Sequence, residues 1–267
     1  PYEDIQVVDI SSGGIAQDFG DTANTANTSG SASSSTRMLL TNGYIAPTST
    51  NTIEFITIAN IASSTDFGDL TVARRRTQSL SNSTRGVHVA GSSVSPTPYL
   101  NVIDYNTIAT AGNAADFGDT SAIMSHGGSV ASSTRGVYSL SYAANQVVNT
   151  LEFITIATTG NGQDFGDLNY SFTYHFRGST CDPTRGLFAG GYNPAKNNID
   201  FITIASTGNG TDFGDLTVAR RSGAGTANSI HSIFAGGYLP GVNNTIDRVL
   251  IQTTGNAADF GDLLVKT

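Results

Sequence analysis

The chain has 267 residues, of which 13% are charged, 30 are Gly and one is Cys. This polar, weakly charged and glycine-rich composition favours many short strands joined by tight turns over helices. The formal net charge is −8 and only two lysines are present, which argues against a nucleic-acid surface. Cys181 stands alone, so it excludes an internal disulfide. No apolar run is long enough to predict a membrane span.

The tetrapeptide Asp-Phe-Gly-Asp occurs six times, at intervals of 48, 50, 48, 48 and 47 residues. A period near 50 is typical of propellers and solenoids, in which no unit buries its apolar surface alone. We therefore expect a single domain over residues 1–267. Its units cover roughly 1–25, 26–75, 76–125, 126–173, 174–221 and 222–267. The copies begin at Asp18, Asp66, Asp116, Asp164, Asp212 and Asp259.

Each unit reads as four antiparallel strands separated by Gly- and Asn-bearing turns. In the last unit the segments are 222–227, 231–238, 245–251 and 259–265. The first contains small residues, so we expect it to lie innermost, where strands crowd a central axis. The third, as in 53–59, is apolar on both faces, as a sheet between two neighbouring sheets requires. The fold class is therefore predicted as an all-β propeller of four-stranded antiparallel blades.

The tetrapeptide has an expected structural role. Its leading Asp can accept hydrogen bonds from the amides of its own turn, and its Gly can adopt a positive φ. The Phe between them is expected to pack against the adjacent blade. An Arg also recurs once per unit near the repeated acids, which suggests a ring of Arg–carboxylate hydrogen bonds. These arginines are Arg37, Arg85, Arg135 and Arg185, and His231 takes their place in the next copy.

Most of the negative charge belongs to the repeat. Six copies with two Asp each supply twelve of the 21 acidic residues. Five more acids stand twelve residues before the leading Asp of a copy, and Gln6 holds that place in the first unit. They are Glu54, Asp104, Glu152, Asp200 and Asp247. The charge is therefore interpreted as architectural.

The number of blades follows from counting half-units. The Asp-Phe-Gly-Asp half occurs six times, whereas the small-residue half occurs five times. This count favours six blades, the first carrying only its outer strands. The alternative is five closed blades with residues 1–25 as an added hairpin. Closure matters because an open ring leaves an unpaired strand edge.

The pattern of an Arg, a strand ending in Gly-Gly and two further strands resembles the kelch-type propeller repeat, with Gly190-Gly191 and Gly236-Gly237 as the double glycines. The amino-acid sequence of segments 51–59, 66–75 and 184–192 is similar to repeats in virion structural proteins of tailed phages that infect marine cyanobacteria. The resemblance covers practically the whole chain. It implies a tail, fibre or capsid-surface component.

The sequence offers no catalytic constellation. The four His lie at different places in their units without metal-ligand spacing, and the Asp-x-x-Asp segments lack the spacing of calcium loops. No Gly-x-Ser-x-Gly is present. We therefore predict no catalytic residue, no metal site and no cofactor.

Positions that break the repeat are the binding candidates. The fourth unit carries an aromatic run in place of the usual Leu-Thr-Val-Ala-Arg-Arg, and its rings could stack on a sugar or a protein partner. Connecting loops of variable length add two further rings. The candidates are Tyr170, Tyr174, His175, Phe176 and Arg177, together with Tyr99 and Tyr238.

These observations lead to a hypothesis of a non-enzymatic, extracellular virion module that builds the particle or attaches it to a host. The expected partners are other virion proteins, or a host surface glycan, within a larger assembly. One alternative is a polysaccharide-degrading tail enzyme, which would need asymmetrically placed acid pairs. Another is a cellular kelch-like lectin or interaction protein.

Overall fold

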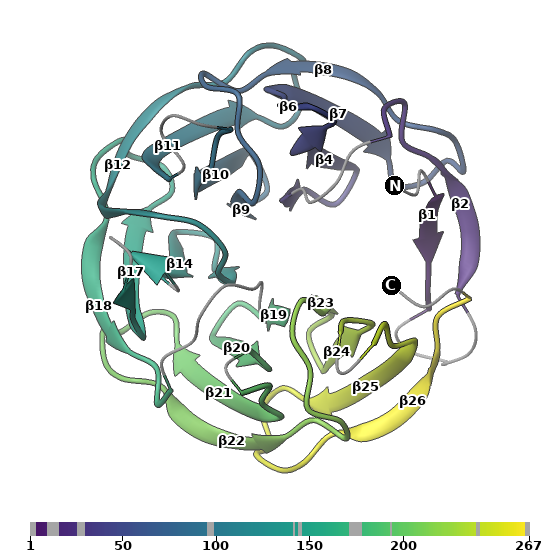
Figure 1. The fold of residues 1–267 in the computed structure, drawn as a ribbon, viewed down its shortest axis with the longest axis vertical. Coiled ribbons are helices and arrows are strands. Elements are labelled where there is room, and N and C mark those ends of the chain that lie inside the picture. The colour runs from purple at the N-terminus through teal and green to yellow at the C-terminus, as the bar shows by residue number, and fades with distance from the viewer. Residues whose placement is uncertain are drawn as a thin grey trace.

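The computed structural model describes most of the chain. The described residues are 4–9, 16–25, 30–94, 99–140, 142–143, 146–170, 178–192, 194–238 and 241–264. They form antiparallel sheets arranged around a central axis, which confirms the predicted all-β propeller (Figure 1).

Five four-stranded blades are present, and in each the strands follow chain order from the axis outward. The innermost strands are β3 (Ser31–Ser33), β9 (Gln78–Ser81), β13 (Ser129–Ala131), β19 (Gly178–Cys181) and β23 (Ala224–Ala227). The second strands are β4 (Arg37–Thr41), β10 (Arg85–Gly91), β14 (Arg135–Ser139), β20 (Arg185–Ala189) and β24 (His231–Ala235). The third strands are β7 (Thr52–Thr57), β11 (Leu100–Thr107), β17 (Thr150–Thr155), β21 (Asn198–Thr203) and β25 (Thr245–Leu250). The outer strands are β8 (Thr65–Asp69), β12 (Ala115–Met124), β18 (Gln163–Asp167), β22 (Thr211–Asp215) and β26 (Ala258–Asp262).

A separate two-stranded sheet pairs β1 (Asp4–Val7) with β2 (Gln17–Asp21). In Figure 1 it occupies the sector between β7–β8 and β25–β26, with β2 on the outer rim. Two small hairpins lie in connections between second and third strands. The pair β15 (Tyr142–Ala143) and β16 (Gln146–Val147) extends the second blade through β12, whereas β5 (Tyr44–Ile45) and β6 (Thr48–Ser49) pair only with each other.

Small residues line the axis, as predicted, and they join neighbouring blades. The Ser81 hydroxyl lies 2.9 Å from the Ser33 amide and 2.8 Å from the Ser33 carbonyl. The Ser179 hydroxyl contacts Ser129 of the previous blade in the same way, at 3.0 and 2.9 Å. A side chain that reaches a backbone this closely leaves no room for a larger residue, which explains the composition of the innermost strands.

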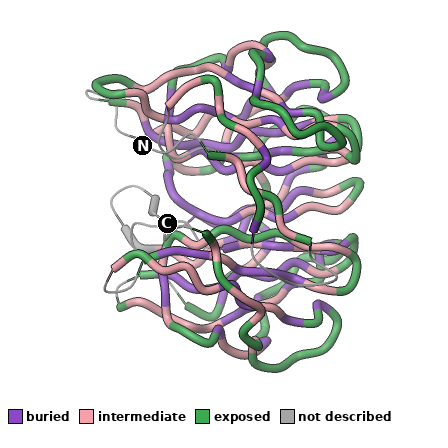
Figure 2. Tube along the Cα trace, turned by 90° about the vertical axis from the view of Figure 1, so that its right-hand side faces the viewer, coloured by how far each residue is buried: buried purple, intermediate pink, exposed green. Residues whose placement is uncertain are grey.

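The third strands are buried on both faces, which confirms the sandwiched arrangement. Ile53 and Glu54 are consecutive and therefore point to opposite faces, yet both side chains are fully buried. Apolar residues of adjacent blades pack together, as Phe67 of one blade and Ile108 of the next do in one cluster. Seen edge-on in Figure 2, buried segments run between two faces of exposed loops.

The Asp-Phe-Gly-Asp segments form the fourth strand of the unit, as predicted, but the turn expected around the leading Asp is part of that strand. In two copies this Asp accepts a hydrogen bond from the Gly amide, at 3.1 Å from Gly20 to Asp18 and at 3.3 Å from Gly261 to Asp259. The segments form the outer strand of every blade, and opposite the third strand they contain a bulge, as between Ile53 and Glu54.

The predicted positive φ of the Gly is confirmed, with 143° at Gly68. The predicted packing of the Phe against the adjacent blade is confirmed as well, because Phe67 is 2% exposed and packs in one cluster with Ile108 of the next blade. Its ring also packs edge-on against Phe55 of its own blade.

The five repeated third-strand acids join each blade to the chain that arrives from the previous one. Asp104 is fully buried and accepts hydrogen bonds from the amide and hydroxyl of Thr71, which follows β8, at 3.1 and 2.6 Å. The other donor–acceptor pairs are Ala23 with Glu54, Ser121 with Glu152, Asn169 with Asp200 and Thr217 with Asp247. The architectural interpretation of these acids is confirmed.

The repeated arginines clamp the blades by a different route from the one predicted. Each guanidinium donates to a backbone carbonyl of the next blade, as Arg85 does to Ile156 at 2.8 Å. Each also lies 4.1–4.4 Å from an aromatic ring of its own third strand. The other clamps join Arg37 to Ile108, Arg135 to Ile204 and Arg185 to Ile251.

The predicted Arg–carboxylate ring is therefore wrong. Arg85 lies opposite Thr107, three residues along β11 from Asp104, so its guanidinium meets an aromatic ring and a carbonyl. In the described part of the chain the ion pairs are Arg74–Asp104 and Arg220–Asp247, at 2.8 and 2.7 Å, and both are buried.

One blade buries a histidine beside such an ion pair. His88 of β10 lies opposite Asp104 and is fully buried. Its Nδ1 is 2.9 Å from the Ser79 hydroxyl, and its Nε2 is 3.1 Å from Oδ1 of Asn106. Because an amide oxygen only accepts, this network assigns the proton of a neutral ring to Nε2. Burial, followed by the charge of Arg74, lowers the pKa of His88 from 6.5 to about 4.

This shift predicts a loss of stability in acid. Between pH 6.5 and 4 the unfolded chain binds a proton at His88 that the folded chain does not, so the free energy of unfolding falls as the pH falls. The loss across this window is expected to be about 3 kcal/mol. Denaturant unfolding of the wild type and of His88→Gln from pH 7 to 4 measures it. The difference between the two curves isolates His88, since both proteins share the carboxylates. A constant difference would contradict the assignment.

Candidate binding face

The antiparallel strand order sorts the connections onto two faces. One face carries the loops between second and third strands and the crossings from each outer strand to the next innermost strand, and we call it the crossing face. The opposite face carries the short turns such as 82–84 and the loops such as 108–114, and we call it the turn face. Its loops differ little between blades, whereas those of the crossing face vary in length and sequence. Variation on a rigid scaffold is typical of binding surfaces.

Several tyrosines lie in the connections of the crossing face, and the side chains of five of them are described. Tyr170, Tyr192 and Tyr238 are the most exposed, at 39%, 39% and 43%, and Tyr44 and Tyr99 are half-buried. Tyr170 comes from a crossing and the others from loops between second and third strands. A tyrosine in a rigid loop offers a large ring surface and a polar hydroxyl at low entropic cost.

Cationic side chains stack on these rings. The Arg221 guanidinium lies 4.3 Å from the Tyr192 ring and 4.6 Å from the Tyr238 ring. Tyr192 belongs to the fourth blade and Tyr238 to the fifth, so Arg221 joins loops of adjacent blades. Backbone bonds between Arg221 and Tyr238, at 3.2 and 2.8 Å, hold the two residues in register. Each cation–π contact at an exposed site contributes about 0.5–1 kcal/mol.

The pattern recurs around the face. Lys196 Nζ lies 5.4 Å from the Tyr170 ring, and Arg75 lies 4.9 Å from the Tyr44 ring. The crossing face therefore presents pairs of aromatic rings and cations held in fixed positions. Tyr and Arg are the side chains enriched at the energetic centres of protein interfaces, and tyrosine rings also stack on sugars.

Backbone strain on this face belongs to the repeat. Arg76, His126 and Ser222 occupy the same position in three crossings, and all have φ near 60°. A left-handed non-glycine residue often marks a functional site. Its recurrence in three blades instead assigns it to the geometry of the crossing.

Of the residues predicted from the sequence, Tyr99, Tyr170 and Tyr238 share the crossing face. Tyr174, His175, Phe176 and Arg177 lie outside the described residues. Sequence reasoning missed Tyr44, Tyr192 and their cation partners. The signal was available, because a Tyr directly follows the glycine of the loop at Gly43, Gly191 and Gly237.

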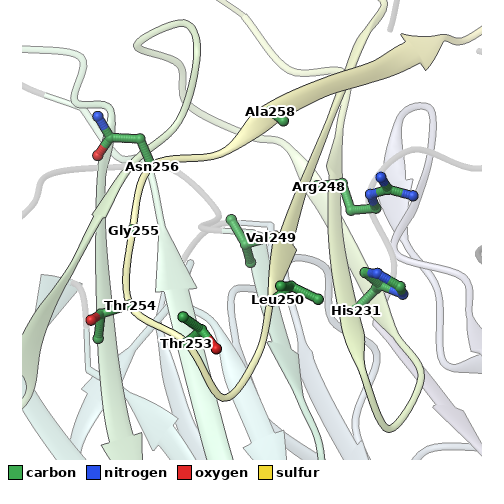
Figure 3. A pocket seen from close by; sticks show the side chains of 9 residues that line it. All are labelled: His231, Arg248, Val249, Leu250, Thr253, Thr254, Gly255, Asn256 and Ala258. Atoms are coloured by element: carbon green, nitrogen blue, oxygen red, sulfur yellow. The ribbon is translucent and has the colours of Figure 1, made fainter.

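A hollow with a volume of about 380 Å³ lies on the turn face of the fifth blade (Figure 3). His231, Arg248, Leu250 and the loop 253–256 line it. His231 stands where other blades carry the clamping Arg, and Arg248 stands where they carry an aromatic ring. The hollow therefore marks a joint that lacks the usual clamp.

Within the described part of the molecule, no group of three or more His, Cys, Asp or Glu side chains is placed to hold a metal ion. No described helix is long and apolar enough to cross a membrane. No protein-family profile and no curated protein matches the sequence.

Proposed function

We propose that the chain is a non-enzymatic binding module whose crossing face holds a protein or glycan partner. The observation that carries the proposal is the stack of Arg221 between two exposed tyrosines from adjacent blades. Stacking and hydrogen bonding fix these side chains before a partner arrives, so binding costs little conformational entropy. The blade joints below keep the face rigid.

A place in a phage particle, as a structural or attachment component, is part of the same proposal. It rests on the amino-acid sequence of segments 51–59, 66–75 and 184–192, which is similar to repeats of virion proteins. The partners would be other virion proteins or a host surface glycan. A rigid disc with one variable face suits both, because its loops can change without disturbing the core.

Binding of the purified chain to a glycan array, and pull-down of phage structural proteins, test the proposal. Replacing both Tyr192 and Tyr238 by Ala is expected to weaken binding about thirty-fold, as truncation of an interface hot spot does. The matched control replaces Ile61 and Ile230, which are 76% and 57% exposed on the turn face. Binding to neither ligand class, or an equal loss in the control, would refute the assignment.

A further inference from the structure

The two-stranded sheet β1–β2 reproduces the outer half of a blade residue by residue. Ile5 pairs with Gly20 and Gln6 with Asp18, just as Ile53 pairs with Gly68 and Glu54 with Asp66. Both sheets carry a bulge at the same place.

The sheet also contacts the next blade as an outer strand does. The Ser64 amide donates to the Asp21 carbonyl at 2.8 Å, as that of Ala114 does to Asp69 at 2.7 Å. Beyond β2, the Ala23 amide donates to the buried Glu54 at 3.1 Å. This sector therefore follows the ring geometry of the blades.

Its inner edge differs from that of every other third strand. Among the described residues β1 pairs with β2 alone, whereas β7 pairs with both β4 and β8. Ile5 is half-buried where Ile53 is fully buried, and Val7 is 41% exposed. An unpaired strand edge with exposed apolar side chains is a template for a further strand.

Gln6 indicates that this edge lacks a hydrogen-bond donor. It takes the place of the third-strand acids, and its Oε1 is buried with no hydrogen-bond partner among the described residues. In two blades the equivalent carboxylate accepts a hydrogen bond from a side chain of the second strand or of the residue just after it. Tyr138 donates to Glu152 at 2.9 Å, and Asn42 donates to Glu54 at 2.8 Å. A buried acceptor without a donor is costly, so the unpaired oxygen points to an inner hairpin.

After β26 the chain turns toward the β1–β2 sector as it turns toward the next blade after the other outer strands. The Leu263 amide, just after β26, donates to the Asn244 carbonyl at 2.8 Å, as that of Leu216 does to Asn197 at 2.7 Å. After β22 this crossing leads to the innermost strand of the next blade. Around the ring, the sector that follows β26 is that of β1 and β2 (Figure 1).

We propose that the inner edge of β1 is an acceptor site for a two-stranded β-hairpin of the chain's own inner-hairpin pattern, delivered by the crossing that leaves β26. The pattern is a strand of small residues, a short turn and an apolar strand, as in β23 and β24. Pairing would satisfy the backbone of β1, cover Ile5 and Val7, and place a donor near Gln6. The sector would then hold a complete sixth blade.

The test appends a copy of residues 221–238 after Thr267 of the full chain. The melting temperature is expected to rise by about 5 °C, because the added strand buries apolar surface and completes the ladder. Amide hydrogen exchange of residues 4–7 is expected to slow at least about tenfold. The matched control carries Pro at the copied Ser232 and Phe234 positions, which removes ladder donors. When Gln6 is replaced by Ala, extending the chain is expected to raise the melting temperature by less than it does in the wild type.

Three results would overturn the proposal. The first is an equal rise with the proline control, which would assign the effect to the added length. The second is unchanged exchange at residues 4–7 in the extended chain. The third is slowed exchange in the unextended chain that depends on protein concentration, with a dimer in light scattering, because the occupant would then be a second copy.

Discussion

Replacing Asp104 by Ala is expected to lower the free energy of unfolding by about 3–5 kcal/mol. Asp104 and Arg74 form an ion pair in which both side chains are 0% exposed. Removing the carboxylate leaves the guanidinium buried without its counter-charge, and it also leaves the Thr71 amide and hydroxyl without an acceptor. Denaturant unfolding monitored by circular dichroism measures the loss.

The double variant Arg74→Met with Asp104→Ala separates the pair from the burial of a lone charge. Since the uncompensated charge causes most of the cost, removing both groups is expected to recover more than half of the loss. If the double variant is less stable than the Asp104→Ala single variant, this explanation fails.

Replacing Gly68 by Ala is expected to cost about 3–5 kcal/mol, from backbone strain and from a clash. Gly68 has a φ of 143°, and an added Cβ would lie 2.5 Å from the Gly112 carbonyl of the next blade. That carbonyl belongs to the loop whose Gly112 amide donates to Phe67 at 2.8 Å. The substitution would therefore push adjacent blades apart.

Gly112→Ala is the matched control. Its φ of 159° is similar, but nothing lies within 4 Å of an added Cβ. It is expected to cost about 1–3 kcal/mol, the strain alone. Equal losses of stability in the two variants, measured by chemical unfolding, would show that the close approach of the blades contributes nothing.

Much of this architecture could be predicted from the sequence because the repeat forces the same residue types into the same places. The repeat period predicted the blade as the repeating unit, and the run of small residues indicated the innermost strand. The acid twelve residues before five of the six tetrapeptides was recognisable as structural. The number of complete blades was harder to predict, because β1 and β2 form only a two-stranded sheet.

The wrong predictions concern pairings that residue types alone do not determine. The recurring arginine was expected on a carboxylate, yet register places Arg85 opposite Thr107 and over the Tyr105 ring. The tetrapeptide was correctly placed in the fourth strand, but its Gly and Asp also suggested a turn. In the structure the Gly lies beside a bulge within that strand, where it adopts its positive φ.

The candidate binding face could be predicted only in part. Tyr99, Tyr170 and Tyr238 were found because they break the repeat or lie in variable loops. Tyr192 was missed because it recurs with the repeat, and its partner Arg221 was taken as part of the repeat. Only the antiparallel order of the strands shows that these residues share one face.

If the crossing face binds the partner, hydrogen exchange measured with and without that partner will slow in the loops that carry Tyr44, Tyr192 and Tyr238. Exchange in the turns of the opposite face will stay unchanged. Slowed exchange confined to the turns at 82–84 and 132–134 would contradict binding at the crossing face.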